Sequence, residues 1–88
     1  MKFYVYMLLS KKKRSYFSYV GYTKDIKKRL YLHNTSKGAK YTKGKKWILI
    51  YKKTYKTKSL ALKEEYKLKK NYILRKKIKK KFITNVKI

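Results

Sequence analysis

Only a few side chains of this sequence can carry acid–base or metal-ion chemistry near neutral pH. They are three carboxylates and one histidine: Asp25, Glu64, Glu65 and His33. A divalent cation needs oxygen ligands, and general acid–base catalysis usually uses a carboxylate or a histidine. A two-metal site would have to combine carboxylates from different elements, whereas one carboxylate can hold one metal ion. The sequence therefore favours a one-metal site.

Spacing does not decide which glutamate would hold that ion. Glu64 and Glu65 both border the apolar stripe of a predicted helix, which carries Leu60, Ala61, Leu62, Tyr66 and Leu68. An ordinary solvated helix charge is the simpler interpretation of either residue on composition alone. The choice between the two glutamates stays open on these grounds.

Arginine is rare in this chain, which otherwise uses lysine for positive charge. It occurs at Arg14, Arg29 and Arg75. A guanidinium presents a planar fork that matches a phosphate, whereas lysine offers a point charge. Arg29 lies one helical turn before His33 on a predicted helix, which makes it a candidate phosphate ligand. An ordinary surface arginine is the alternative.

Strand composition predicts the elements that must position these groups. Aromatic and branched residues indicate strands at 3–9 and 16–22, and a third from 47 to about 55. The polar run at 10–15 predicts an antiparallel hairpin between the first two strands. Gly21 lies inside the second strand, where a glycine marks either a simple bend or the close approach of a phosphate or catalytic group.

Helical spacing predicts three helices. Thr23 is the expected cap of the first, which carries Ile26, Leu30 and His33 and ends at residues 34–38. A basic loop follows at 40–46, Ser59 is the expected cap of the second helix, and the third runs from about 72 to 81. The order strand, strand, helix, strand, helix, helix predicts an α+β fold. We expect helices to cover one face of a small antiparallel sheet that includes Tyr4, Tyr6 and Tyr19.

The charge of the chain indicates the class of its partner. Lys and Arg number 29 against three acids, a formal net charge of +26 over 88 residues. Lysines that neutralise phosphates release counterions, so such a surface binds DNA or RNA with a steep salt dependence. A lysine-rich composition inherited from a genome poor in G and C, and an anionic membrane surface, are the alternatives. Nucleic acid is the partner that we expect.

Length and composition also limit the domain organisation and the compartment. We expect one domain over residues 1–82 and a short basic tail over 83–88. The absence of cysteine excludes a disulfide framework and thiolate metal sites. Residues 3–9 are too short an apolar run for a signal peptide, and no stretch approaches the roughly 20 apolar residues of a membrane span. We therefore expect a soluble cytoplasmic protein without a membrane partner.

Together, these residues resemble the GIY-YIG nuclease superfamily. The two strand motifs are Tyr4-Val5-Tyr6 and Tyr19-Val20-Gly21, and the helix supplies Arg29 and His33. Three downstream segments are similar to the small stand-alone bacterial branch related to the catalytic domain of the UvrC excision nuclease: residues 38–42, 47–51 and 61–69. The resemblance covers residues 2–70, and it rests on the order and spacing of motifs that are individually unspecific.

The resemblance implies a three-stranded antiparallel sheet flanked by helices and a phosphodiesterase site with one divalent metal ion, Mg²⁺ or Mn²⁺. Tyr6 and Tyr19 match the catalytic tyrosines, with Tyr19 the preferred water-activating base. Arg29 matches the arginine that steadies the phosphate, His33 a supporting histidine, and Glu65 the metal ligand. Further nucleic-acid contacts are expected from the basic loop and the second helix: Lys40, Tyr41, Lys43, Lys45, Lys46 and Lys69.

Two features depart from the family pattern. Tyr4 replaces the glycine that names the first motif. A downstream asparagine ligand of some relatives has no clear counterpart, because Asn71 lies too near Glu65 and Asn85 lies in the expected tail.

The function that follows is a metal-dependent endonuclease acting on DNA, with branched or damaged structures in repair or recombination as expected substrates. RNA stays open as a substrate. The alternative is a catalytically weak or inactive nucleic-acid-binding module of the same fold. A requirement for a partner protein or for a second copy of the chain also stays open.

Overall fold

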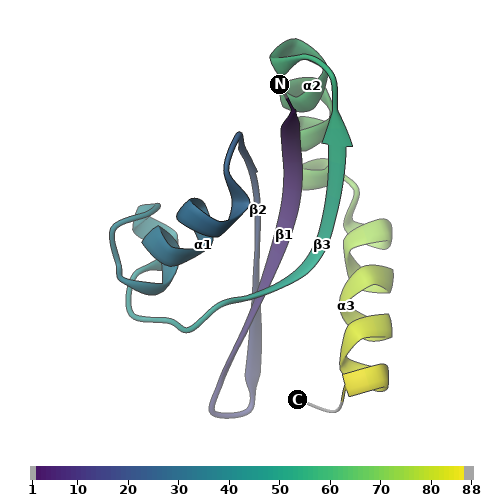
Figure 1. The fold of residues 1–88 in the computed structure, drawn as a ribbon. Helices are drawn as coiled ribbons and strands as arrows, with labels where there is room; N and C mark the ends of the chain where they lie inside the picture. Colours follow the sequence, from purple (N-terminus) through teal and green to yellow (C-terminus); the bar gives the residue numbers. More distant parts are fainter. Residues whose placement is uncertain (1, 87–88) are drawn as a thin grey trace.

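A computed structural model describes residues 2–86 of the chain. Its elements are β1 (Phe3–Lys12), β2 (Ser15–Thr23), α1 (Ile26–Asn34), the short 3₁₀ helix η1 (Lys40–Thr42), β3 (Ile48–Tyr55), α2 (Lys58–Lys70) and α3 (Tyr72–Val86). The strands form one antiparallel sheet in the order β2-β1-β3 (Figure 1). The predicted fold class and order of strands and helices are confirmed.

The central strand β1 is buried on both faces of the sheet. Val5 and Met7 face α2 and pack with its Ala61 and Leu68. Tyr6 and Leu8 point to the opposite face, where they pack with Trp47 and with Ile26 and Leu30 of α1. Alternation along a strand explains the division, because successive side chains point to opposite faces. The expectation of one covered face was wrong, since α1 and the segment before β3 cover the second face (Figure 1).

The hairpin of β1 and β2 extends further than apolar composition predicts. Lys12 pairs with Ser15, so the turn consists of Lys13 and Arg14. Lys13 adopts a φ of 57°, the left-handed conformation that such a tight turn requires. Strand pairing is a backbone property, so polar residues continue it beyond the apolar run.

Both helix caps lie two residues from the expected ones. Asp25 caps α1, with its Oδ1 accepting a hydrogen bond from the Lys28 amide at 3.1 Å. Thr57 caps α2 and accepts from the Leu60 amide at 3.1 Å. A cap side chain must reach an amide three residues ahead in the first turn. The Thr23 hydroxyl instead accepts from the Asp25 amide before the helix starts.

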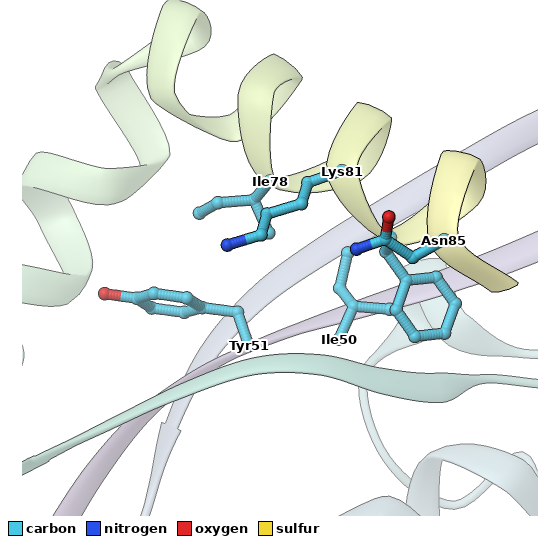
Figure 2. A pocket seen from close by; sticks show the side chains of 6 residues that line it. Ile50, Tyr51, Ile78, Lys81 and Asn85 are labelled. Carbon is cyan, nitrogen blue, oxygen red and sulfur yellow. The ribbon is translucent and has the colours of Figure 1, made fainter.

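Helix α3 packs along β3 and continues to Val86, beyond its expected end near Lys81. Ile78, Phe82 and Asn85 of α3, together with Ile50 and Tyr51 of β3, border an open groove of about 430 Å³ (Figure 2). Residues 83–86 of the expected tail are therefore helical, and 87 and 88 lie outside the described residues. Within residues 2–86, no helix combines the length and apolar character needed to cross a membrane.

Candidate active site

The phenol of Tyr6 lies over Gly21 on the neighbouring strand. Tyr6 and Gly21 are paired across β1 and β2, and this pairing runs through Gly21 without a shift of register. A Cβ atom at Gly21 would lie only 2.5 Å from Cζ of Tyr6. Of the two interpretations of Gly21, the close approach is therefore correct, and the approaching group is the side chain of Tyr6.

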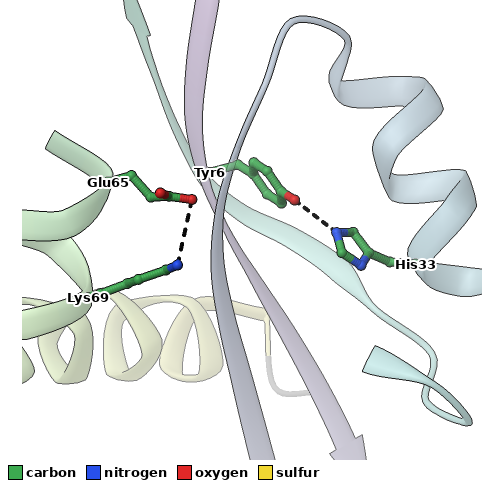
Figure 3. Close-up of polar contacts among 4 residues, drawn as sticks. All are labelled: Tyr6, His33, Glu65 and Lys69. Atoms are coloured by element: carbon green, nitrogen blue, oxygen red, sulfur yellow. Dashed lines mark hydrogen bonds and ion pairs between the residues drawn. The ribbon is translucent and has the colours of Figure 1, made fainter. Parts of the chain in front are cut away.

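Tyr6 is linked to His33 and Thr42 through buried hydrogen bonds. The Tyr6 Oη lies 2.8 Å from Nε2 of His33 (Figure 3), and Nδ1 of His33 lies 2.9 Å from Oγ1 of Thr42. The Thr42 hydroxyl donates to the Ala39 carbonyl at 2.8 Å. Tyr6 is 2 % exposed, and His33 and Thr42 are fully buried. The three side chains thus connect β1, α1 and η1 in the interior.

Tyr19 lies between this buried chain and the surface. Its ring centroid is 4.9 Å from that of His33 and 6.4 Å from that of Tyr6. On its other side it stacks with Tyr41 at 6.2 Å, and Tyr41 is 50 % exposed. A molecule at the surface can therefore reach Tyr19, whereas Tyr6 is covered.

Electrostatic effects at Tyr6 show which groups surround it. Burial raises the pKa of Tyr6 to about 12; a hydrogen bond from Arg29 opposes this increase, while Tyr19 and the carboxylate of Glu65 add to it. Burial, and then the positive charge of Arg29, lower the pKa of His33. At neutral pH, Tyr6 is therefore protonated and His33 is uncharged.

The raised pKa of Tyr6 predicts a loss of stability at alkaline pH. The unfolded chain releases this proton near pH 10, while the folded chain keeps it until about pH 12. Between these values the unfolded state binds fewer protons, so the free energy of unfolding falls with rising pH by about 1.4 kcal/mol per unit. Below pH 10 the contribution is fully present.

Urea unfolding in EDTA between pH 9.5 and 11.5 measures this effect, with Tyr6→Phe as the reference. The variant retains every other titrating group, so the difference between the two slopes isolates Tyr6. Equal slopes for both proteins would show that the Tyr6 pKa is not raised.

The fold separates the two glutamates of α2. The charge of Glu65 helps to raise the pKa of Tyr6, and its carboxylate forms an ion pair with Lys69 at 3.7 Å (Figure 3). Glu64 forms an ion pair with Lys67 at 3.2 Å. It faces β3, where the pKa of Tyr55 is raised by burial, then by Glu64 and by Tyr51. Glu65 is thus the glutamate on the side of Tyr6.

The donor set around Glu65 suits a hard cation that keeps most of its water. Residues 2–86 contain no group of three or more His, Cys, Asp or Glu side chains placed to hold a metal ion. Mg²⁺ commonly uses one or two carboxylates and completes its shell with water and substrate phosphate oxygens. The half-buried carboxylate of Glu65, 18 % exposed, fits that arrangement. Neither Asn71 nor Asn85 joins Glu65, because Asn71 lines a groove with Glu64, and Asn85 of α3 borders the groove beside Ile50 and Tyr51 of β3.

A groove of about 230 Å³ crosses the free edge of β2 beside Tyr19. Its walls bring together β2, the η1 segment, α2 and α3, with Ser18, Tyr19, Val20, Tyr41, Lys69 and Arg75. The Nε of Arg75 donates to the Leu68 carbonyl at 3.1 Å, which fixes its guanidinium at the groove. Arg75 was not among the predicted site residues, although its rarity was the available signal.

The basic loop lies next to this groove. The Lys45 ammonium lies 5.1 Å from the ring centroid of Phe17 and 5.2 Å from that of Tyr41. The other predicted lysines of this segment, Lys40, Lys43 and Lys46, are exposed. Tyr41 and Lys69 line the groove itself, so the predicted nucleic-acid contacts divide into groove residues and exposed loop residues.

Asn34 and Trp47 hold the loop against the sheet. Neither was among the predicted site residues. Asn34 bonds the Trp47 backbone through both amide atoms, donating to its carbonyl at 3.1 Å. The Trp47 indole donates to the Thr42 carbonyl at 3.0 Å. These bonds fix the position of Thr42 beneath His33.

The chain is similar to a known family and to known bacterial proteins. A family model of the GIY-YIG catalytic domain matches residues 2–81. A UPF0213 protein of Staphylococcus epidermidis is 54 % identical over 52 residues, which cover 58 % of this chain and 63 % of that protein. A UPF0213 protein of Staphylococcus aureus is 47 % identical over 62 residues, 69 % of this chain and 74 % of that protein.

A solved structure is also similar. The solution NMR structure of the UPF0213 protein BH0048 from Bacillus halodurans is 36 % identical, covers 88 % of this chain and 80 % of that one, and superposes with a TM-score of 0.47. The aligned part of the Staphylococcus epidermidis relative is less than two thirds of its length. The family match over residues 2–81 confirms what the two tyrosine motifs predicted: the chain belongs to the GIY-YIG family.

Proposed function

We propose that the protein is a metal-dependent endonuclease that hydrolyses phosphodiester bonds of DNA. The observation that carries this proposal is the convergence of groups from three other elements on Tyr6. Tyr6 of β1 interacts with Tyr19 of β2, with Arg29 and His33 of α1 and with Glu65 of α2. Its family is of the nuclease type. A phenol, a guanidinium, an imidazole and a carboxylate can supply the base, the phosphate contacts and the metal ligand that phosphodiester hydrolysis uses.

We assign each side chain a role that its position supports. Arg29 holds oxygens of the scissile phosphate, because a guanidinium binds phosphate in a fork. Tyr19, as the phenolate, accepts a proton from the attacking water, since it borders the groove while Tyr6 is buried. The water oxygen bonds to phosphorus as the P–O3′ bond breaks, and the departing O3′ takes up a proton from solvent water, which leaves a 5′-phosphate and a 3′-hydroxyl. Mg²⁺ or Mn²⁺, held by Glu65, would supply charge stabilisation at the phosphate.

The groove at the β2 edge supports a polyanionic substrate. Lys69 and Arg75 place positive charge beside Tyr19, and Tyr41 exposes an aromatic face there. These groups contact phosphates and stack on bases without reading a particular sequence. We therefore propose branched or damaged DNA as the substrate, in repair or recombination in the cytoplasm.

A cleavage assay that compares two arginine variants tests the proposed activity. We expect the wild-type protein to cleave plasmid, flap or four-way-junction DNA with Mg²⁺ or Mn²⁺ and to be inactive in EDTA. Arg29→Ala should lower the rate by about 10²–10³-fold, the cost of losing a donor to the developing charge. Arg14→Ala removes an exposed arginine of the hairpin turn and should leave cleavage unchanged. Equal rates for wild type and Arg29→Ala would contradict the proposal.

The second candidate is a nucleic-acid-binding module without turnover. The stack of Tyr41 on Tyr19, with Lys45 over the Tyr41 ring, supports it because such surfaces hold single strands. Gel shifts with the same DNAs and with single-stranded RNA, without cleavage in any metal, would establish this module in place of the enzyme.

A further inference from the structure

The hydrogen bonds around His33 determine where its proton lies. A threonine hydroxyl has one proton, and a carbonyl oxygen can only accept. Because the Thr42 hydroxyl donates to the Ala39 carbonyl, its oxygen must accept from Nδ1–H of His33, 2.9 Å away. The uncharged ring then has a lone pair on Nε2. The Tyr6 hydroxyl, 2.8 Å from Nε2, therefore donates its proton in the bond to His33.

We propose that Thr42 is a positioning residue that holds His33 in the Nδ1–H tautomer and so fixes Nε2 as the acceptor of the Tyr6 proton. The chain of donors runs from Tyr6 through His33 and Thr42 to the Ala39 carbonyl. In the opposite tautomer, with Thr42 still bonded to Ala39, lone pairs of Nδ1 and Oγ1 would face each other, and the Tyr6 hydroxyl would accept from Nε2–H and lose His33 as its acceptor. The burial of all three side chains leaves water no place to correct such a mismatch.

The surroundings of Thr42 leave it little freedom to adopt another arrangement. Its amide donates to the Ala39 carbonyl at 3.1 Å within η1, and its carbonyl accepts from the Trp47 indole. Gly38 closes the same space, because a Cβ there would lie 2.5 Å from Nδ1 of His33. Thr42 and His33 are therefore held together from both sides.

The tautomer matters for the proposed nuclease because it keeps the phenol of Tyr6 oriented beside Tyr19 and Arg29. An analogous loss of a supporting hydrogen bond at metal sites costs about 10–100-fold. This catalytic consequence rests on the proposed function. The tautomer itself does not, since it is a property of the resting protein.

Nitrogen-15 NMR of the metal-free protein tests the proposal directly. His33 is the one histidine of the sequence, so its two ring nitrogens give an unambiguous spectrum. We expect a single Nδ1–H tautomer in wild type and in Thr42→Ser, which keeps the hydroxyl. Thr42→Val keeps the shape but removes the hydroxyl, so its spectrum should contain the Nε2–H form.

Thr35→Val is the matched control. Thr35 is exposed at the end of α1 and donates to the Tyr31 carbonyl at 2.8 Å, away from the His33 ring. The Thr35→Val variant should retain the wild-type tautomer of His33. An Nε2–H tautomer in wild type, or a pure Nδ1–H tautomer in Thr42→Val, would overturn the proposal. If Thr42→Val fails to fold by circular dichroism, Thr42→Ala takes its place as the variant without the hydroxyl.

Cleavage assays separate this inference from the proposed function. With an active wild type, Thr42→Val should lose about 10–100-fold in rate and Thr42→Ser should restore it. An inactive wild type with the Nδ1–H tautomer would remove the nuclease and leave the role of Thr42 intact. Full activity in a Thr42→Val protein of changed tautomer would show that the tautomer is not used in cleavage.

Discussion

Glu65→Gln should strongly reduce metal-dependent cleavage, while the same change at Glu64 should leave it intact. The two residues are adjacent on α2, but the charge of Glu65 adds to the raised pKa of Tyr6, whereas that of Glu64 adds to the raised pKa of Tyr55. Glutamine preserves the size of the side chain and removes the charge that attracts a divalent cation. The expected loss is about 10²–10³-fold in rate at a fixed Mg²⁺ concentration, comparable with removal of one charge-stabilising group.

The pair also controls for effects on folding. Each glutamate forms one ion pair within α2, Glu65 with Lys69 and Glu64 with Lys67. Such helix pairs contribute about 0.3–0.5 kcal/mol, so both variants should unfold at nearly the same urea concentration. Rates are measured over a range of Mn²⁺ concentrations, because a weakened metal site is partly rescued by more metal. Equal losses in both variants would refute the assignment of Glu65 as the metal ligand.

The order of the elements was predictable because local composition determines it. Apolar aromatic and branched residues mark β1 and β2, and helical spacing marks the three α-helices. Their ends were not predictable in the same way. Lys11 and Lys12 continue β1 only because β2 offers pairing partners, which is a property of the hairpin and not of lysine.

The residues of the site were predictable where their type is scarce. Arg29 and His33 stand out in a chain that uses lysine almost everywhere and has one histidine. The choice of Glu65 over Glu64 needed the family resemblance. The physical reason for the difference is the orientation of α2 about its own axis. Ala61 and Leu68 set this orientation by packing on β1, which is a tertiary contact.

Thr42 could not be predicted as a partner of His33. Threonine is a common residue, and the two positions meet only because η1 turns the chain back beneath α1. Arg75 joins the groove for a similar reason, because α3 starts directly after α2 and brings the Arg75 side chain to the groove beside Tyr19. Contacts of this kind depend on loop paths that spacing along the chain does not encode.

Gly21→Ala should displace Tyr6 and impair both stability and cleavage. The new Cβ would lie 2.5 Å from Cζ and 2.8 Å from Cε2 of Tyr6, whose ring is buried and held by His33. Either the ring moves and breaks its bond to His33, or β1 and β2 separate locally. Overpacking of this kind costs about 1–3 kcal/mol, measured as the shift in urea unfolding. Cleavage should fall by about 10-fold or more, since Tyr6 organises the surrounding groups.

A double-mutant cycle distinguishes this clash from an effect on the backbone. Gly21 is paired in a regular strand, so its substitution should be costly only while the Tyr6 ring is present. In a Tyr6→Ala background, the cost of Gly21→Ala should therefore shrink to a few tenths of a kcal/mol. The difference from its cost in the wild-type background is the coupling energy between Gly21 and Tyr6. Gly44→Ala is the contrasting control, because Gly44 has a φ of 75° and an open space around it. It should cost about 1 kcal/mol through backbone strain, with or without the Tyr6 ring. An undiminished cost of Gly21→Ala without the Tyr6 ring would show that glycine is needed there for the strand and not for the tyrosine.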